Sequence, residues 1–254
     1  MDNRNIEKLI KFINESDNIV FFGGAGVSTE SGIPDFRSKD GLYNQKDVRF
    51  EQFTPEYLLS KECLNHNPRV FFEFYRQKLD VRNYEPNMSH KFLKTLEDIG
   101  KLKGIVTQNI YGLHQKAGCT NVYEIHGTTS KNYCCKCNKT YDVNYIFDDN
   151  NIRNGIPRCE CRGIVRPDVT LYGEKLPVNI VDMAIDRIKN ADMLIIAGTS
   201  LTVYPAAMYV NEFRGEHIVI INRDEISFTL DEENDLFIQG SVGEIFAKVN
   251  ELMN

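Results

Sequence analysis

The sequence predicts a doubly wound α/β fold, in which a mostly parallel sheet is covered by helices on both faces. Apolar runs of strand length alternate along the chain with segments of helical periodicity. Each run is almost continuously apolar, as expected of strands that are buried on both faces. A cluster of cysteines within residues 130–167 interrupts the alternation and predicts a small inserted module.

The elements of the first half follow from apolar spacing and from helix-start signals. Apolar residues three and four apart indicate helices, and short runs rich in Val, Ile and Phe indicate strands. Thr54 followed by Pro55 marks a further helix start, because Thr caps and Pro suits the first turn. The expected helices are 4–15, 68–79 and 90–99, and the expected strands are 19–23, 102–107 and 122–125.

The second half repeats the pattern after the cysteines. The expected helices are 178–189, 205–213 and 242–253, and the expected strands are 192–197, 217–221 and 235–238. Polar residues follow directly after most of the predicted strands. Because the carboxyl ends of parallel strands meet at one edge of a sheet, we expect these polar residues to form one ligand site.

Composition bounds the class of protein. A chain of 254 residues with 42% hydrophobic content can hold one large domain, or a large domain with a small insert. A net charge of −6 argues against nucleic acid as the main partner. No apolar run reaches the roughly 18 residues of a membrane span, and the amphipathic N-terminus lacks the apolar region of a signal peptide. We therefore expect a cytoplasmic protein without a membrane partner.

Clustered thiols in a chain without an export signal favour a metal site over disulfides. The predicted ligands are two close pairs, Cys134 and Cys137, and Cys159 and Cys161. Two such pairs can close a tetrahedral, structural Zn²⁺ site, although the tighter second pair leaves free or redox-active thiols as an alternative. Cys135 is not expected to be a ligand, because adjacent residues point apart. Cys63 and Cys119 are expected to be buried apolar residues.

The strand 19–23 runs directly into the glycine turn 23–26. A backbone without Cβ atoms can approach a phosphate closely, but the third glycine of the usual dinucleotide fingerprint is missing. A tight turn without a ligand explains the glycines equally well. The polar segment 28–37 is unlike an amphipathic helix and predicts a mobile loop that closes over a ligand. In that loop Phe36 would exclude water, and Arg37 would bind phosphate or carboxylate.

One histidine stands at the predicted site. His126 follows the strand 122–125 and precedes Gly127, at the carboxyl edge of the sheet. A neutral imidazole is suited to act as a general base near pH 7. The other histidines have helix or strand contexts and are expected to be structural; they are His66, His90, His114 and His217.

The segment GAGVSTESGIPDFRS at 24–38 closely resembles the NAD-binding signature of the sirtuins, which are NAD-dependent protein-lysine deacylases. The resemblance covers nearly the whole chain and includes TQNI, the His-Gly pair, the cysteines, RPDVTLYGE, GTSLTVYPAA and IN. It implies a Rossmann-like NAD-binding domain, residues 1–129 and 168–254, with a zinc-ribbon insert, 130–167. Part of the helical segment 38–85 would form the small-domain side of the cleft.

The resemblance also implies roles for individual residues. His126 would be the general base, and Asn109 and Gln108 would contact the nicotinamide ribose and help to position water. The implied NAD-binding residues are Gly24, Ala25, Gly26, Ser28, Asp35, Phe36, Arg37, Gln108, Asn109, Ile110, Tyr111, His126, Gly198, Thr199, Ser200, Asn222, Arg223 and Val242.

The acetylated peptide would pair with a strand that carries Val169, Thr170, Leu171, Tyr172 and Gly173. Taken alone, that stretch also fits an ordinary edge strand. Sirtuins that prefer succinyl or malonyl groups carry Tyr-x-x-Arg in a helix that lines the acyl pocket. Phe72 and Tyr75 look like the corresponding positions here, although aromatic residues in this helix are first of all expected in the core. Since no arginine stands there to pair with a carboxylate, we expect acetyl or other neutral acyl groups.

One position departs from the family pattern. Where sirtuins have T-Q-N-I-D, this chain has Tyr111 in place of the carboxylate that accepts hydrogen bonds from the nicotinamide carboxamide. The larger, neutral phenol is expected to weaken nicotinamide capture, by about 1.5–3 kcal/mol for each charge-assisted hydrogen bond lost.

The function expected from the sequence is NAD-dependent deacetylation of protein lysines, yielding nicotinamide and O-acetyl-ADP-ribose. A mono-ADP-ribosyltransferase or NAD hydrolase that uses the same pocket is an alternative, although it would not need the base His126. A second alternative is an NAD-binding protein whose chemistry is impaired by Tyr111. A zinc ribbon that binds nucleic acid is a more distant one, which salt-sensitive DNA binding would support.

Overall fold

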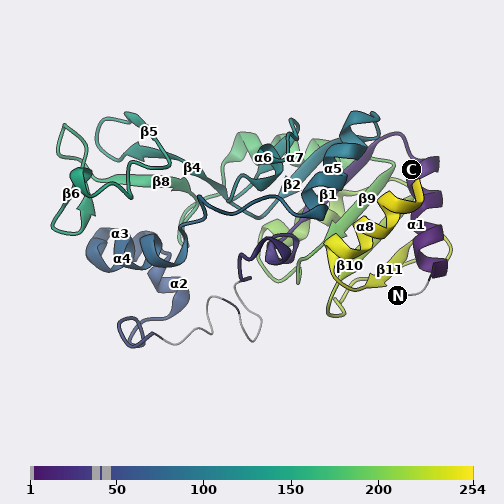
Figure 1. The fold of residues 1–254 in the computed structure, drawn as a ribbon, viewed down its shortest axis with the longest axis horizontal. Helices are drawn as coiled ribbons and strands as arrows, with labels where there is room; N and C mark the ends of the chain where they lie inside the picture. Colours follow the sequence, from purple (N-terminus) through teal and green to yellow (C-terminus); the bar gives the residue numbers. More distant parts are fainter. Residues whose placement is uncertain (1–2, 36–40, 42–46, 254) are drawn as a thin grey trace.

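The computed structural model describes residues 3–35, 41 and 47–253. Two units lie side by side along the long axis of the molecule (Figure 1). The larger is built around a parallel sheet and contains both ends of the described chain. The smaller contains the cysteine-bearing segment together with three short helices.

The larger unit confirms the predicted parallel sheet. Its strands are β1 (Ile19–Gly23), β2 (Leu102–Thr107), β3 (Val122–Glu124), β9 (Met193–Ala197), β10 (His217–Asn222) and β11 (Leu236–Gln239). Their order is β11-β10-β9-β1-β2-β3, and all neighbours pair in parallel. β1 is fully buried and pairs with β2 on one side and with β9 on the other. The chain first extends the sheet from β1 through β2 to β3, and later extends it on the other side of β1 through β9, β10 and β11. Ligands of open α/β sheets bind at such a switch point.

Helices cover both faces of this sheet, as predicted. One face packs on α1 (Asn3–Glu15), α5 (Met88–Asp98) and α8 (Val242–Met253), and the other on α7 (Val178–Lys189) and the 3₁₀ segment η5 (Ala206–Glu212). The α-helix predicted near 205–213 is therefore a 3₁₀ helix. Its buried Ala207 and Val210 are three residues apart, which is one 3₁₀ turn.

The smaller unit joins two parts of the chain that are distant in sequence. Its helices are α2 (Pro55–Leu58), α3 (Lys61–His66) and α4 (Pro68–Lys78), and its sheet strands are β4 (Gly127–Cys134), β5 (Thr140–Asp142) and β8 (Val165–Val169). The 3₁₀ turn η4 (Asp149–Asn151) precedes the hairpin of β6 (Ile152–Arg153) and β7 (Ile156–Pro157). Phe71, Phe72 and Tyr75 of α4 share one core with Cys134 and Val165.

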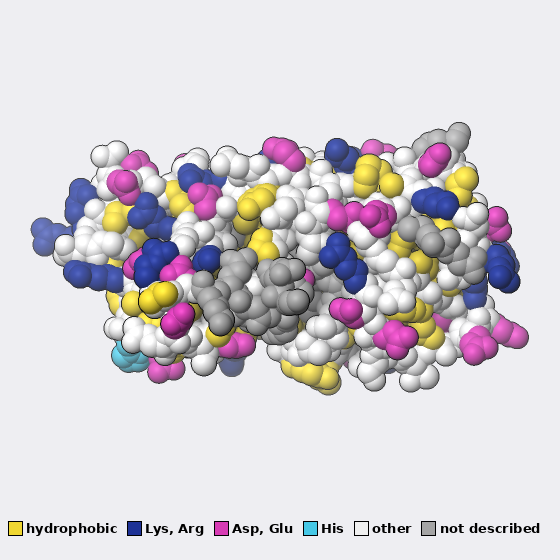
Figure 2. Space-filling view, turned by 60° about the horizontal axis from the view of Figure 1, so that its bottom comes forward, with side chains coloured by type: hydrophobic (Ala, Val, Ile, Leu, Met, Phe, Trp, Pro, Cys, Tyr) yellow, Lys and Arg dark blue, Asp and Glu magenta, His cyan; other side chains and the backbone are white. Residues whose placement is uncertain are grey.

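Charge is unevenly distributed between the units. Figure 2 shows Lys and Arg side chains gathered at the end of the molecule that carries the cysteine segment. Residues 130–167 contain more Lys and Arg than Asp and Glu, although the whole chain has a net charge of −6. Among the described residues, no helix combines the length and apolarity that crossing a membrane requires.

The segment after β1 differs from the expected mobile loop over the part that the structure describes. Two 3₁₀ turns, η1 (Ala25–Val27) and η2 (Thr29–Ser31), follow the strand. The side chain of Asn87 donates to the carbonyl of Val27 and to the hydroxyl of Ser31. Glu30 accepts a hydrogen bond of 2.6 Å from the backbone N–H of Gly243, at the start of α8. These contacts fix the first half of the segment to the larger unit.

Candidate active site

A cavity of about 910 Å³ lies at the carboxyl ends of the parallel strands and extends to the smaller unit. This volume is typical of small-molecule sites. The turns after β1, β2, β9, β10 and β11 all contribute lining residues, which confirms that the polar strand ends meet at one site. The predicted residues that line it are Ala25, Gly26, Asp35, Gln108, Asn109, Ile110, Tyr111, His126, Gly198, Thr199, Ser200, Asn222, Arg223 and Val242. Val169, Thr170, Leu171, Tyr172 and Gly173 line it as well.

The glycine turn after β1 packs against the turn after β9. A Cβ atom at Gly24 would lie 2.7 Å from the carbonyl oxygen of Gly198, and one at Gly26 would lie 2.7 Å from the Gly198 Cα. Gly198 has φ +59°, and its own Cβ would lie 2.5 Å from the Val27 nitrogen. The glycines are therefore required by close backbone packing. Gly26 and the neighbouring Ala25 line the cavity, whereas Gly24 is not among its lining residues.

Asn109 holds this turn in place. Its side-chain amide donates to the carbonyl of Gly24, at 2.9 Å, and to the hydroxyl of Ser28, at 3.1 Å. Ser28 is fully buried and does not line the cavity, so its position suits bracing of the turn. Asn109 itself lines the cavity and is braced by its own N–H, which donates to the Thr107 hydroxyl.

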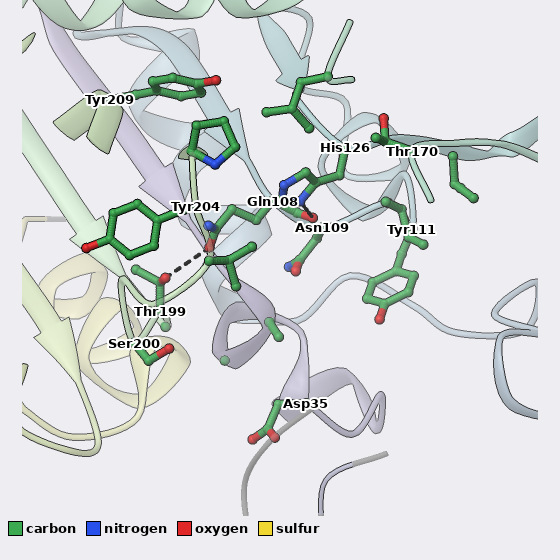
Figure 3. Close-up of a pocket in the computed structure, with 18 of the residues that line it drawn as sticks. Asp35, Gln108, Asn109, Tyr111, His126, Thr170, Thr199, Ser200, Tyr204 and Tyr209 are labelled. Carbon is green, nitrogen blue, oxygen red and sulfur yellow. Dashed lines mark hydrogen bonds between the residues drawn. The ribbon is translucent and has the colours of Figure 1, made fainter. Parts of the chain in front are cut away.

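Gln108 presents an unused donor to the site. Its Oε1 accepts a hydrogen bond of 2.9 Å from the hydroxyl of Thr199 (Figure 3). Its Nε2 is buried and has no hydrogen-bond partner among the residues that the structure describes. A buried donor without a partner is costly, so a polar ligand that accepts from it would be stabilised.

His126 has a defined tautomer. Its Nδ1 lies 2.9 Å from the carbonyl oxygen of Gln108, and because that oxygen can only accept, Nδ1 carries the proton. Nε2 is then left with a lone pair. Burial lowers the pKa of His126, against the effect of the Gln108 carbonyl, so the ring is neutral near pH 7. Figure 3 shows the ring beside Gln108 and Asn109.

Tyr111 borders the cavity close to His126 (Figure 3), and only 8% of it is exposed. Burial, assisted by the negative charge of Asp35, raises the pKa of its hydroxyl. The phenol is therefore neutral at any physiological pH. Phe36 and Arg37, which were expected on the same side, lie outside the described residues.

Sequence reasoning misplaced the acyl side of the site. Phe72 and Tyr75 are almost completely buried in the core of the smaller unit and do not line the cavity. Leu59 and Leu79 line it instead. Nothing in their local sequence distinguishes these two leucines from core residues, because only the packing of α2 and α4 brings them to the cavity wall.

Sequence reasoning also missed a group on the far wall, formed by Val203, Tyr204, Pro205 and Tyr209. These residues come shortly after the strand end at Gly198, which was a usable signal. Tyr204 is 71% exposed at the mouth of the cavity.

The expected strand at 169–173 is wrong over most of its length. β8 ends at Val169, and beyond it only Tyr172 makes an isolated bridge, to Ser60. The N–H of Leu171 donates to the carboxylate of Glu174, and Gly173 has φ +83°, so the backbone turns instead of continuing the ladder. The segment nevertheless forms a wall of the cavity.

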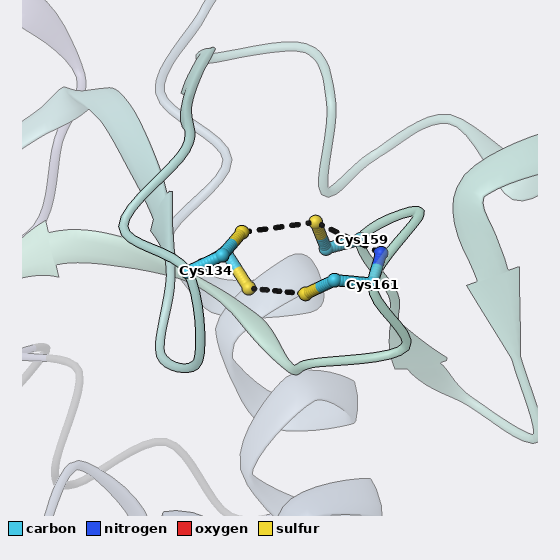
Figure 4. A group of neighbouring side chains, drawn as sticks. Cys134, Cys159 and Cys161 are labelled. Carbon is cyan, nitrogen blue, oxygen red and sulfur yellow. Dashed lines mark hydrogen bonds between the residues drawn. The ribbon is translucent and has the colours of Figure 1, made fainter.

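The predicted zinc ligands come together in the smaller unit. The Sγ atoms of Cys134, Cys137, Cys159 and Cys161 all lie within 4.8 Å of one another, and Cys135 is not part of the group. The Cys134–Cys161 and Cys137–Cys159 separations are 3.5 and 3.6 Å (Figure 4). Sulfur atoms at about 2.3 Å from a tetrahedral Zn²⁺ are about 3.8 Å apart, so the group fits that ion.

Two further contacts suit a thiolate cluster. The hydroxyl of Tyr141 donates to Cys159 Sγ at 3.0 Å, and this hydrogen bond lowers the pKa of the thiol to about 6. A Cβ at Gly163 would lie 2.6 Å from Cys134 Sγ, so the second cysteine loop needs glycine to approach the first. Cys63 and Cys119 are buried, as expected.

Comparison with known proteins gives consistent matches over the whole chain. A family model described as Sir2 family matches residues 24–205. A curated NAD-dependent protein deacetylase of Clostridium perfringens (strain 13 / Type A) is 51% identical over 252 residues, which are 98% of this chain and 99% of that protein.

Two solved structures are similar in fold and sequence, and each match covers 98% of both chains. A Sir2 variant with a deacetylated p53 peptide and 3'-O-acetyl ADP ribose has a TM-score of 0.85 and 31% identity. A Sir2 complex with a p53 peptide and NAD⁺ has a TM-score of 0.82 and 32% identity.

Proposed function

The chain belongs to the Sir2 family, and from this premise we propose that it removes acetyl groups from protein lysines with NAD as co-substrate. The products are nicotinamide, the free lysine and O-acetyl-ADP-ribose. The observation that carries the proposal is the state of His126, a neutral imidazole whose Nδ1–H is bound to Gln108 while Nε2 remains available as a base.

NAD supplies an electrophilic ribose carbon, from which nicotinamide departs and which the acetyl-lysine amide oxygen attacks. The protein's own contribution is to orient groups and to accept a proton. His126 Nε2 would take a proton from a ribose hydroxyl, so that this oxygen can attack the acyl carbon. Water would then add, and the lysine amine would leave with a proton. The Gln108 carbonyl stabilises the imidazolium that forms, because it accepts from Nδ1–H.

The residues around His126 position the co-substrate. The buried Nε2 of Gln108 is proposed to donate to the nicotinamide ribose, with Asn109 beside it. Ala25, Gly26 and Ser200 lie where backbone and hydroxyl groups would hold the phosphates. The proposed remainder of the nucleotide site is formed by Asn222, Arg223 and Val242.

The acetylated peptide is proposed to lie along the wall formed by residues 169–173. Leu59, Leu79 and Leu171 would surround the acyl group, which favours an acetyl or other neutral group over a carboxylate. Tyr111 is proposed to weaken nicotinamide capture. It also makes an NAD-binding protein with impaired chemistry the second candidate function, because a buried neutral phenol cannot replace a carboxylate acceptor.

We further propose that the larger unit is the NAD-binding domain and that the smaller unit is a zinc-bearing insert with a structural metal. Four thiols gathered as metal ligands suit a reducing compartment, and this supports our proposal that the protein acts in the cytoplasm. Acetylated protein and NAD are the proposed partners, and nucleic acid is not.

The test is one incubation with NAD and an acetyl-lysine peptide, followed by mass spectrometry, with His126→Ala as the control. Loss of one acetyl group, appearance of O-acetyl-ADP-ribose and a silent control are expected. Binding of NAD without either product would support the impaired NAD-binding protein instead. A peptide that gains an ADP-ribose mass would point to the transferase.

A further inference from the structure

The segment 169–174 connects the catalytic base with both units. The N–H of Thr170 donates to the backbone carbonyl of His126, at 2.8 Å. Two residues later, Tyr172 donates to the carbonyl of Leu59 and accepts from the N–H of Lys61, at 3.0 and 2.9 Å. The wall of the cavity is thus attached to the larger unit at His126 and to the smaller unit between α2 and α3.

A buried ion pair, Arg166 and Glu174, makes hydrogen bonds to the backbone of this segment. Arg166 Nη1 and Nη2 donate to the two carboxylate oxygens of Glu174, at 2.6 and 3.0 Å. The same guanidinium donates to the carbonyls of Val169, at 2.5 Å, and Pro167, at 3.2 Å. The Glu174 carboxylate also accepts from the N–H of Leu171. One pair therefore binds the backbone of the segment at its beginning and in its middle.

The pair is well shielded from water, since only 4% of the Arg166 side chain and 21% of the Glu174 side chain are exposed. Burial alone would raise the pKa of Glu174, but the hydrogen bonds from Arg166 and from the Leu171 N–H hold that pKa below its usual value. The carboxylate is thus charged, and removing one partner would leave the other buried and unpaired.

We propose that Arg166 and Glu174 are positioning residues for the acetyl-lysine peptide, because they set the backbone of segment 169–174 along which the peptide would lie. The proposal rests on the deacetylase function proposed above. Glu174 lines the cavity, whereas Arg166 acts only through the residues it binds. Neither residue lies at the strand ends that form the nucleotide side, so their effect should fall on the peptide and spare NAD.

A purely structural role is the competing explanation, and the local contacts argue against it. Near Arg166, β8 is already paired with β4, where Tyr133 is opposite Arg166 and Cys134 is opposite Val165. The cysteine group and the core of the smaller unit therefore have their own connections. Arg166 also contacts β8 and β4, through the Pro167 carbonyl and the Tyr133 ring. The other hydrogen bonds of the ion pair go to the segment that borders the cavity.

The test compares Glu174→Gln, which keeps the shape and removes the charge, with Arg76→Gln as a matched control. Arg76 forms an ion pair of 2.8 Å with Asp149 in the same unit. For Glu174→Gln we expect the peptide KM to rise roughly tenfold to a hundredfold, because a buried guanidinium is left unpaired. The Kd for NAD, measured by calorimetry without peptide, should stay at its wild-type value. Arg76→Gln should change neither constant.

A double variant, Arg166→Met with Glu174→Leu, separates positioning from folding. Apolar replacement of both partners leaves no unpaired charge, so the chain is expected to fold with a melting temperature above that of Glu174→Gln. Its peptide KM should still rise, because the hydrogen bonds to Val169 and Leu171 are gone. A double variant with wild-type peptide KM would overturn the proposal, as would a Glu174→Gln variant that loses affinity for NAD and peptide equally.

Binding measurements keep this test separate from the deacetylase assay. In a His126→Ala background, peptide affinity is measured by fluorescence anisotropy with a labelled acetyl-lysine peptide, so no turnover is needed. If the wild type does not deacetylate, the proposed function fails. If it does, but Glu174→Gln binds the peptide as tightly as its parent, only the positioning role fails.

Discussion

Replacing Tyr111 by aspartate tests whether this residue weakens nicotinamide capture. The change is expected to lower the stability of the fold while it strengthens the binding of nicotinamide. Tyr111 is 8% exposed and packs in the core of the smaller unit. Removing a buried aromatic ring costs about 3–5 kcal/mol of unfolding free energy. Against this, a carboxylate that accepts from the nicotinamide carboxamide would contribute about 1.5–3 kcal/mol per hydrogen bond.

The two effects are measured separately. Denaturant unfolding should show the free energy of unfolding of Tyr111→Asp lowered by about 3 kcal/mol or more. Among folded molecules, nicotinamide release from NAD in the presence of acetyl-peptide should rise about tenfold or more. Inhibition by added nicotinamide should strengthen. Burial and the neighbouring Asp35 would raise the pKa of the new carboxyl group, so the gain should grow with pH as that group ionises.

Tyr111→Phe is the matched control, because it keeps the ring and removes only the hydroxyl. Its stability should stay within about 1 kcal/mol of the wild type, and its turnover should not increase. A folded Tyr111→Asp variant with unchanged NAD kinetics and unchanged nicotinamide inhibition would refute the reasoning.

Three further outcomes are expected. Gly24→Ala should lower the free energy of unfolding by about 1–3 kcal/mol in denaturant titrations, because its Cβ would lie 2.7 Å from the Gly198 carbonyl. Gly104→Ala, whose Cβ would have no neighbour closer than 3.4 Å, should cost less, and equal losses would contradict the packing argument. Because burial lowers the pKa of His126, activity should fall only as pH drops through that lowered value, so the acid limb of kcat/KM should lie below about 6.5; a limb above 7 would exclude this assignment. Metal analysis should find one zinc per chain. Cys137→Ser should lose both the zinc and thermal stability, whereas Cys135→Ser should keep both. A chain that keeps its melting temperature after complete chelation would show that the metal is not structural.

Local signals in the sequence predicted the elements and their order. The Thr54 cap forms as expected, with its side chain accepting from the Tyr57 N–H, and Leu102–Thr107 is a strand at the predicted residues. The four cysteine ligands were also predictable, because their spacing within two short loops already limits where the thiols can lie. In each case the signal itself spans only a few residues of the chain: a cap, an apolar run, or the spacing within one pair of cysteines.

Other features depended on which segments pack against each other. Phe72, Tyr75 and Leu79 are all apolar residues of one helical segment, and the sequence does not show which of them faces the cavity. The packing of α4 on the cysteine segment buries Phe72 and Tyr75 and brings Leu79 to the cavity. Gly24 belongs to a recognisable turn, yet its neighbour is Gly198, far away in sequence.

The sequence by itself therefore determined the fold class and the spacing of the two thiol pairs, because periodicity, capping and ligand spacing act over a few residues. It also predicted His126 as the base, from its place after a strand and from the family resemblance. The tertiary structure alone decided the shape of segment 169–174. Its apolar and β-branched residues favour a strand, but the buried pair of Arg166 and Glu174 and the bonds from Thr170 to His126 and from Tyr172 to Leu59 bend it into a wall of the cavity. Hydrogen bonds to these partners satisfy backbone groups of the segment without a further ladder, and the partners are too far away in the sequence for a local pattern to indicate them.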